Sequence, residues 1–256
     1  MTSSSQSRPG APERSEGGSP QGGGLCRRVC ILLCLCDGVL HRTKRFVPDY
    51  RYTTRLVGNR NADEVVIIDV TPAERRSRNR HLFYDALERY AAECYSPITV
   101  GGGIRTLAEV ELLIRDYSAD KVVIGAEHLF MDSLADRIAR KFGQQVLVAA
   151  INYRDSDGMK ERVIPLEAGE LLLNSIDRDG SLLGYDLMQL ARAAETALCP
   201  VMVAGGCGTW QHMADAFGVG ASAACTSVIH HLTETSLAAC KRWLGENCRQ
   251  PVRAAA

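Results

Sequence analysis

The sequence of 256 residues lacks the features that mark several classes of protein. Its 30 basic and 30 acidic residues leave no net charge, so nothing favours binding to nucleic acid or to an anionic membrane surface. The longest N-terminal apolar run, Val29–Cys36, is too short to cross a bilayer, and no small-residue cleavage site follows it. We therefore expect neither a membrane anchor nor a signal peptide. No G-x-x-x-x-G-K-[ST] motif occurs, which argues against ATP binding.

Metal-binding spacings are also absent from the sequence. The six histidines form no H-x-x-x-H or H-E-x-x-H pair, and the ten cysteines form no C-x-x-C pair. Cys26, Cys30, Cys34 and Cys36 could form a metal cluster, but the same run also has the pattern of a buried strand. Most cysteines lie in apolar patterns, where a free thiol behaves as a small hydrophobic group. We predict no metal, no cofactor and a reducing, cytoplasmic location.

Two stretches of the chain repeat one order of elements. Residues 64–126 and 170–228 both have the pattern of a strand, a loop carboxylate, a helix, a strand, a Gly-Gly turn, a helix and a strand. The glycine pairs are Gly102–Gly103 and Gly205–Gly206. Such a pair between a strand and a helix presents backbone N–H groups at a helix N-terminus, which favours anions. Two facing copies predict a ligand with a phosphate at each end.

Short apolar runs alternate with helical patterns, which is typical of a parallel sheet covered by helices. The expected strands are Val29–Cys36, Glu64–Val70, Pro97–Val100, Lys121–Ile124, Val146–Ile151, Glu170–Ile176, Val201–Ala204 and Ala223–Thr226. The expected helices are Phe83–Cys94, Thr106–Tyr117, Met131–Phe142, Asp186–Leu198, Thr209–Phe217 and Leu232–Glu246. Eight such strands predict an α/β fold, a (β/α)8 TIM barrel built from a half-barrel repeat, whose active site lies at the C-terminal strand ends.

The barrel is expected to span residues 26–250, after a disordered tail at residues 1–25 that is rich in Ser, Gly, Pro and Gln. Two connections between strands have few residues that could form a covering helix. Asp49–Asn61, between the first two strands, has room for only a short helix, and the segment between Asn152 and Glu170 is mostly charged or turn-like. Helices 1 and 5 of the barrel are therefore predicted to be shortened, which puts closure of the barrel under strain.

Four motifs carry a resemblance to a known family. They are EVVIID (Glu64–Asp69), VGGGIRT (Val100–Thr106), NSIDRDG (Asn174–Gly180) followed by GYD, and VAGGCG (Val203–Gly208). Together they resemble the cyclase (synthase) subunit of imidazole glycerol phosphate synthase, the HisF family, over roughly residues 28–244. The resemblance implies a lyase or cyclase of histidine biosynthesis. In that family a glutaminase subunit docks on the N-terminal barrel face, and ammonia crosses the interior to a bisphosphorylated substrate at the C-terminal face.

The resemblance also implies roles for particular residues. Phosphate contacts are expected at Gly102, Gly103, Gly205 and Gly206, and more weakly at Thr226 and Ser227. The family guards the ammonia entrance with four charged residues, which match Arg28, Glu64, Lys121 and Glu170. Each of the four opens an apolar run and so lies at the bottom of the barrel, where desolvated charges must pair with one another.

The positions of the family's catalytic carboxylates carry other residues here. The family uses two aspartates as general acid and base, and the matching positions are Cys34 and Asn152. An amide cannot transfer protons in this way, and the thiol has no basic neighbour in sequence. Asp69 and Asp177 follow strands at the barrel top, and we expect them to position substrate. The arginine-rich stretch Glu74–Arg80 is expected to be a loop there.

Several interpretations remain open from sequence alone. The chain is a synthase subunit that receives ammonia from a glutaminase and delivers it to a phosphorylated substrate, with full imidazole glycerol phosphate synthase activity as one form of this. Alternatively, it belongs to a divergent branch that accompanies amidotransferases of surface-polysaccharide sugars. It could also be a non-catalytic ammonia conduit, since both acid–base positions are replaced. A barrel that fails to close is the remaining alternative.

Overall fold

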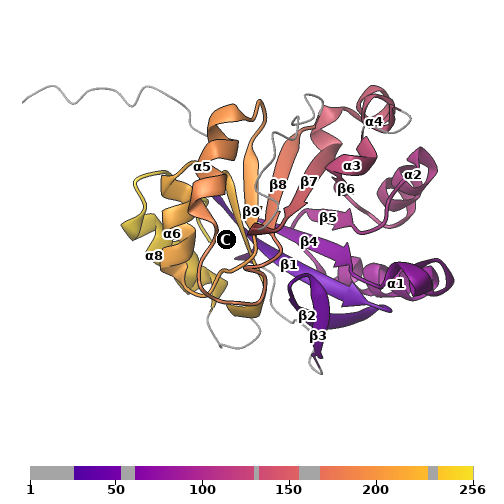
Figure 1. Ribbon diagram of the computed structural model, residues 1–256, viewed down its shortest axis with the longest axis horizontal. Helices are drawn as coiled ribbons and strands as arrows, with labels where there is room; N and C mark the ends of the chain where they lie inside the picture. Colours follow the sequence, from indigo (N-terminus) through magenta and orange to yellow (C-terminus); the bar gives the residue numbers. More distant parts are fainter. Residues whose placement is uncertain (1–25, 53–60, 130–132, 156–167, 230–235, 256) are drawn as a thin grey trace, which may run out of the picture.

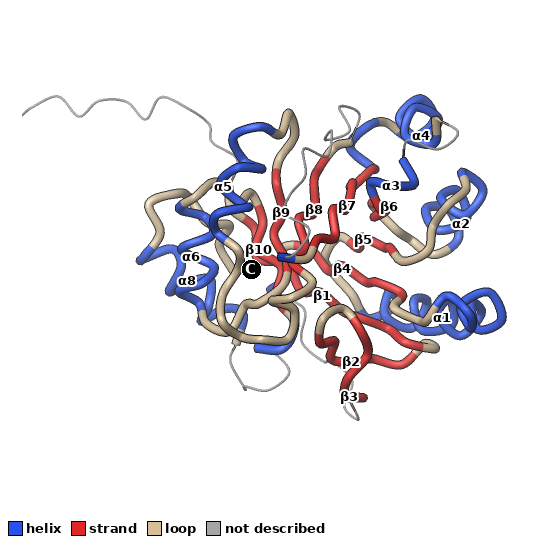
Figure 2. The backbone as a smooth tube through the Cα atoms, viewed as in Figure 1, coloured by secondary structure: helices blue, strands red, loops and turns tan. Residues whose placement is uncertain are grey.

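The computed structural model describes the whole chain except residues 1–25, 53–60, 130–132, 156–167, 230–235 and 256. The predicted N-terminal tail lies outside these described residues, as do parts of both connections that were expected to have shortened helices. The described residues form one ten-stranded sheet, in which eight parallel strands close into a barrel and two more extend it as a hairpin. In Figure 2 the strands converge at the centre and helices surround them.

The barrel strands are β1 (Arg28–Cys36), β4 (Glu64–Asp69), β5 (Ile98–Gly101), β6 (Lys121–Gly125), β7 (Leu147–Tyr153), β8 (Glu170–Ser175), β9 (Val201–Ala204) and β10 (Ala223–Thr226). Each pairs in parallel with its neighbours, and β10 pairs with β1 from Arg28 opposite Ala223 to Ile31 opposite Thr226. This last pairing closes the ring. The predicted (β/α)8 barrel is therefore confirmed, and the expected strain does not prevent closure.

Side chains on each barrel strand alternate between two cores. On β1, Val29, Ile31 and Leu33 point outward beneath the helices, while Cys30 and Leu32 point into the barrel with small and branched residues of the other strands. The alternation follows from the two-residue period of a strand. Because both faces are covered, the barrel strands appear in the sequence as continuous apolar runs.

The helices are α1 (Ala73–Glu93), α2 (Leu107–Asp116), the short α3 (Ala126–Leu129), α4 (Leu134–Phe142), α5 (Leu187–Thr196), α6 (Trp210–Gly218) and α8 (Leu237–Asn247), with a 3-10 turn η2 (Gln144–Val146). Figure 1 shows α1 to α4 around one side of the barrel and α5, α6 and α8 around the other. Thr106 and Thr209 cap α2 and α6, so each helix that follows a Gly-Gly turn begins with a threonine that accepts a backbone N–H.

A hairpin that the sequence did not reveal follows β1. Strands β2 (Val39–Lys44) and β3 (Val47–Arg51) extend the sheet at the C-terminal end of the barrel. The two turn residues, Arg45 and Phe46, both have positive φ values of 54° and 59°, as a tight hairpin turn requires. The Phe46 amide donates to the carboxylate of Asp179 at 2.9 Å, which ties the hairpin to the loop after β8.

One helix boundary was predicted wrongly. Helix α1 begins at Ala73, ten residues before the expected start at Phe83. The stretch Glu74–Arg80 is therefore the first part of a helix and not a loop. Pro72 is the N-cap residue and fits there because the first helical N–H groups have no partner within the helix. The other strands and helices begin and end close to the predicted residues, apart from the first residues of the expected helices Met131–Phe142 and Leu232–Glu246, which lie outside the described residues.

Glycine at position 102 is required by the fold. Gly102 has a φ of 101°, and a Cβ atom there would lie 2.3 Å from the backbone oxygen of Asp69. We predict that Gly102→Ala lowers the free energy of unfolding by about 3 kcal/mol, because both the positive φ and the backbone overlap oppose a side chain. Gly245→Ala is the matched control: it lies in α8 with no atom within 4 Å of the added methyl group.

Chemical denaturation of the two variants tests this prediction. The control should be more stable than the parent protein by about 0.5–1 kcal/mol, because alanine is the better helix former. Equal stability of Gly102→Ala and the parent protein would contradict the close approach of Gly102 to the backbone of Asp69.

Candidate functional site

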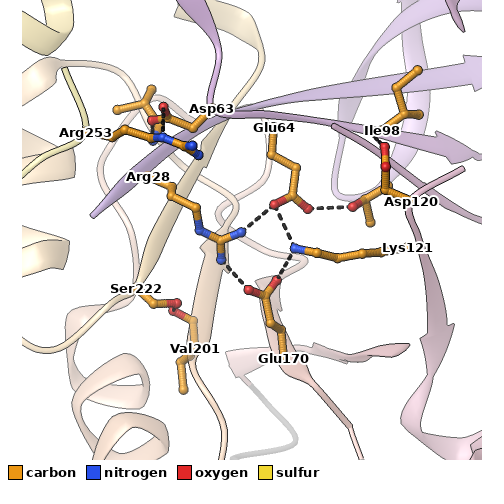
Figure 3. Close-up of polar contacts among 12 residues, drawn as sticks. Arg28, Asp63, Glu64, Ile98, Asp120, Lys121, Glu170, Val201, Ser222 and Arg253 are labelled. Atoms are coloured by element: carbon orange, nitrogen blue, oxygen red, sulfur yellow. Dashed lines mark hydrogen bonds and ion pairs between the residues drawn. The ribbon is translucent and has the colours of Figure 1, made fainter. Parts of the chain in front are cut away.

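Four charged side chains form a closed ring at the N-terminal end of the barrel (Figure 3). Arg28 contacts Glu64 at 2.5 Å through one terminal nitrogen and Glu170 at 2.5 Å through the other. Lys121 lies opposite, with its ammonium group 3.0 Å from each of the same two carboxylates. Positive and negative groups therefore alternate around the barrel axis, and every one of the four has two oppositely charged neighbours.

The ring exists because each of its members opens a barrel strand. Arg28, Glu64, Lys121 and Glu170 are the first residues of β1, β4, β6 and β8, and all four side chains point inward. The hydroxyl of Thr99 on β5 donates at 2.5 Å to the second carboxylate oxygen of Glu64. This carboxylate therefore has one neutral partner in addition to its two charged ones. All four side chains are at least four-fifths buried, and Glu64 is 2% exposed.

Charges at this depth must be paired to be tolerated. Burial lowers the pKa of Arg28, but the nearby Cys30 and the carboxylates of Glu170 and Glu64 outweigh it and raise this pKa overall. Lys121 donates to one oxygen of each of the same two carboxylates at 3.0 Å. Removing one member would leave a buried charge uncompensated, which costs far more than the net contribution of an intact pair.

The opposite end of the barrel contains a cavity of about 230 Å³. It is bounded by the carboxyl ends of β4 to β8, by the Gly102–Gly103 turn and by Phe46 from the hairpin. Its polar lining consists of Asp69, Arg76, Arg105, Glu127, His128, Asn152 and Asn174. Between this cavity and the charged ring lies the apolar interior of the barrel, which is made of aliphatic, alanine and cysteine side chains.

The two Gly-Gly turns both have positive φ values but have different surroundings. Gly102 and Gly103 have φ values of 101° and 73°, and Gly205 and Gly206 have values of 89° and 102°. The first pair lines the cavity, whereas Gly206 packs against the backbone of Gly184.

The rest of the second half surrounds other spaces. A separate open pocket lies beside the second turn and is lined by Arg178, Gly184, Asp186 and His212, among others. Thr226 is buried at the end of β10, and Ser227 follows it, half-buried. The six predicted phosphate contacts are thus not brought to one cavity.

The structure places Asn152 in the cavity lining, whereas Cys34 is buried and is not part of that lining. The side chain of Asn174 donates to that of Asn152 at 2.9 Å across neighbouring strands β7 and β8. The Cys34 thiol points into the barrel, 3.9 Å from the hydroxyl of Thr43. Burial, assisted by the negative charge of Asp179, raises the pKa of Cys34 to about 12. The thiol is therefore neutral near pH 7 and is not an effective base.

The two aspartates expected to position substrate have different environments. Asp69 is buried and lines the cavity, where it accepts from Arg80 at 2.7 Å and from the Thr71 amide at 2.9 Å. Asp177 lies outside the cavity lining and binds Arg154 at 3.3 Å and a backbone amide at 2.8 Å. Of the two, Asp69 lines the cavity and Asp177 does not.

Residues that the sequence analysis missed include Asn174, Arg76 and Phe46. Asn174 could have been found from the two-residue period of β8, which places it on the same face as Leu172 and Glu170. Arg76 was assigned to a loop because the start of α1 was not recognised. Phe46 gave no signal, since the hairpin that carries it was not predicted.

Among the described residues, no group of three or more His, Cys, Asp or Glu side chains could hold a metal ion. The described part of the chain also has no helix both long and apolar enough to span a bilayer. These observations leave a parallel α/β barrel with a charged ring at one mouth and a polar cavity at the other.

Comparison with known proteins places this barrel in a family. Residues 32–236 match the family described as histidine biosynthesis protein. The subunit HisF of imidazole glycerol phosphate synthase from Streptomyces coelicolor is 33% identical over 236 residues, which cover 84% of this chain and 92% of the relative. The HisF subunit from Alkaliphilus metalliredigens is 35% identical over 213 residues, 75% of this chain and 83% of the relative. The HisF subunit from Hydrogenobaculum is 33% identical over 249 residues, which cover 87% of this chain and 97% of the relative.

The chain belongs to the histidine biosynthesis protein family, and the three relatives named above are all HisF subunits. The resemblance inferred from the four motifs is therefore confirmed.

The ring generates a prediction about stability. Glu64→Gln leaves Arg28 and Lys121 facing the single carboxylate of Glu170, and we expect it to lower the free energy of unfolding by about 3–5 kcal/mol. Adding Lys121→Met to this variant removes the excess positive charge and should restore part of the loss. Urea denaturation of the single and double variants measures both effects.

Glu111→Gln serves as the control, since it breaks an ion pair with Lys141 on the outer surface. Exposed pairs contribute little to stability, so this variant should unfold almost as the parent does. Equal effects of the inner and outer substitutions would show that the ring is solvated.

Proposed function

We propose that this chain is a HisF-type synthase subunit that accepts ammonia from a glutaminase and delivers it to a phosphorylated small molecule in the cavity. Membership of the histidine biosynthesis family supports the reaction type, and the names of its relatives supply the enzyme, imidazole glycerol phosphate synthase. The observation that carries the proposal is the ring of four paired charges, which lies at the opposite end of the barrel from the cavity.

The two ends of the barrel suit different tasks. Ammonia is small and neutral, so an apolar interior does not oppose its passage, whereas ammonium and other ions would be desolvated there. The paired charges at the N-terminal mouth provide polar contacts for a hydrated molecule and for a docked glutaminase. At the other mouth, the Gly102–Gly103 turn and nearby arginines favour a phosphate group. Delivery would then occur in the cavity beside Asn152 and Asn174.

The chemistry at the cavity differs from acid–base catalysis by two aspartates. We propose that Cys34 and Asn152 occupy the two aspartate positions, since they lie at the C-terminal ends of the first and fifth barrel strands. The buried thiol stays protonated, and the amide is engaged with Asn174. Asp69 accepts from Arg80, which also donates to the backbone oxygen of Gly102, so we assign Asp69 a positioning role.

A second candidate function rests on the absence of a carboxylate at positions 34 and 152, which are occupied by Cys34 and Asn152. If no side chain transfers protons in ring closure, the chain conducts ammonia to an acceptor that needs no cyclisation, or activates the glutaminase without chemistry of its own. A phosphorylated or nucleotide-linked sugar is the acceptor that this alternative requires, as in amidotransferases of surface polysaccharides. The two candidates differ in whether the bisphosphorylated substrate of imidazole glycerol phosphate synthase is consumed.

A reconstitution assay tests the proposal. The chain is mixed with a glutaminase subunit of the same family, with either glutamine or an ammonium salt, and with the bisphosphorylated substrate. We expect faster glutamine hydrolysis in the presence of the chain, because the glutaminase docks at the charged mouth. Consumption of the substrate supports the synthase, and stimulation without consumption supports the conduit. No binding and no stimulation would contradict both.

Restoring the carboxylates tests the assignment of the catalytic positions. We predict that Cys34→Asp with Asn152→Asp raises the rate of cyclisation with ammonium salt by roughly 100-fold or more, because a positioned acid and base contribute factors of that size. Cys36→Asp with Asn152→Asp is the control, since Cys36 is also buried on β1 but two residues further on. Equal rates for both pairs would show that a carboxylate at position 34 has no specific role in cyclisation.

A further inference from the structure

Two cysteines face each other across the seam at which the barrel closes. Cys30 on β1 and Cys225 on β10 are directly opposite each other in the parallel pairing of the first and last barrel strands. Both are free thiols inside the barrel, and their exposed fractions are 0% and 2%. Among the described residues, no other two cysteines are in register on neighbouring strands.

The pair lies between the charged ring and the cavity. On β1, Arg28 of the ring is the inward-facing residue before Cys30, and Leu32, which lines the cavity, is the one after it. Ala204 on β9, the other neighbour of β10, also lines the cavity. The two thiols are therefore one layer of side chains below the cavity, where a small neutral molecule that enters the apolar interior reaches them.

The two thiols interact with each other. A side-chain hydrogen bond with Cys225, followed by burial, raises the pKa of Cys30 well above its usual range. The Cys30 thiol is therefore protonated near pH 7. Since the thiolate is the reactive form, the pair stays reduced unless an oxidant enters the barrel.

The spacing of parallel strands is compatible with a bond between the two sulfur atoms. Neighbouring strands lie about 4.7–4.9 Å apart, and the Cα atoms of disulfide-bonded cysteines are about 4.4–6.8 Å apart. The Cβ atoms in a disulfide are closer, at about 3.5–4.5 Å, so β1 and β10 must approach each other slightly when the bond forms. A disulfide formed under such strain is reduced more easily than an unstrained one.

We propose that Cys30 and Cys225 form a redox-active pair, which hydrogen peroxide oxidises to a disulfide that locks the β1–β10 seam. One thiol loses its proton and attacks an oxygen of the peroxide, the O–O bond breaks, and a sulfenic acid and one water form. The second thiol attacks the sulfenic sulfur, and its proton leaves with the hydroxyl group as a second water. Two thiols and one peroxide thus give one disulfide and two waters, with sulfur oxidised and oxygen reduced.

The bond would join the first and last strands of the barrel covalently. It would close a loop over residues 30–225, which constrains the unfolded chain along most of its length. Separation of β10 from β1 would then require reduction of the disulfide. The inference does not rest on the proposed function, because it concerns the seam of the barrel and not the ligand or the partner.

Oxidation of the reduced full-length chain with hydrogen peroxide at low protein concentration tests the proposal. The remaining free thiols are alkylated, the chain is cleaved without reduction, and linked peptides are identified by mass spectrometry. We expect two peptides joined through Cys30 and Cys225, with two hydrogens fewer than the separate peptides, that separate on treatment with dithiothreitol. The oxidised protein should unfold at a temperature about 5 °C higher than the reduced protein.

Cys225→Ala removes one partner and should abolish both the link and the rise in unfolding temperature. Cys30→Ala is the second variant, and it decides the question if Cys225→Ala does not fold. Cys36→Ala is the matched control, because Cys36 is also a buried, inward-facing residue of β1 but has Val39 opposite it on β2. This control should form the link to the same extent as the parent protein.

Three outcomes would overturn the proposal. The first is the absence of a link between Cys30 and Cys225 under conditions that oxidise the exposed Cys26. The second is a link that joins either cysteine mainly to another thiol. The third is an unfolding temperature that does not rise when the link is present, which would show that the bond does not lock the seam.

Discussion

The barrel is organised around the need to pair four desolvated charges. Each of the four would be expensive to bury alone, and an isolated pair in the same place would gain little. In the alternating ring each charge is attracted by two opposite charges. Each side chain is desolvated once but gains two attractive interactions. This arrangement is possible only if β1, β4, β6 and β8 begin at the same level around one axis. Closure of the barrel and pairing of the charges therefore depend on each other.

The opposite mouth has lost the symmetry that the repeat suggests. Both halves keep a Gly-Gly turn with positive φ and a threonine-capped helix after it. Only the first turn faces the cavity, where Arg76 and the Asp69–Arg80 pair surround it. The second turn packs against Gly184 and the loop after β8. The repeated sequence pattern thus gives two glycine turns with positive φ values in two different environments.

Much of the fold could be predicted from the sequence, for physical reasons that also explain the failures. Barrel strands are buried on both faces, so they are visible as apolar runs, and a charge that opens such a run must lie at a strand start. The β2–β3 hairpin was missed because its strands are partly exposed and mostly polar. The start of α1 was missed because several arginines, unfavourable at a helix N-terminus, follow Pro72. Because the start of α1 was not predicted, Arg76 was not recognised as a cavity residue. Asn174 belongs to the NSIDRDG motif, but its contact with Asn152 depends on the register between β7 and β8, which the sequence does not reveal.

The most direct test of the account is an experimental structure of the chain at a resolution that defines side-chain positions. We expect Arg28 and Lys121 each to contact both Glu64 and Glu170 in one closed ring at the N-terminal mouth, with β10 paired to β1 behind it. Either cation turned toward solvent, or an open seam between β10 and β1, would contradict the account.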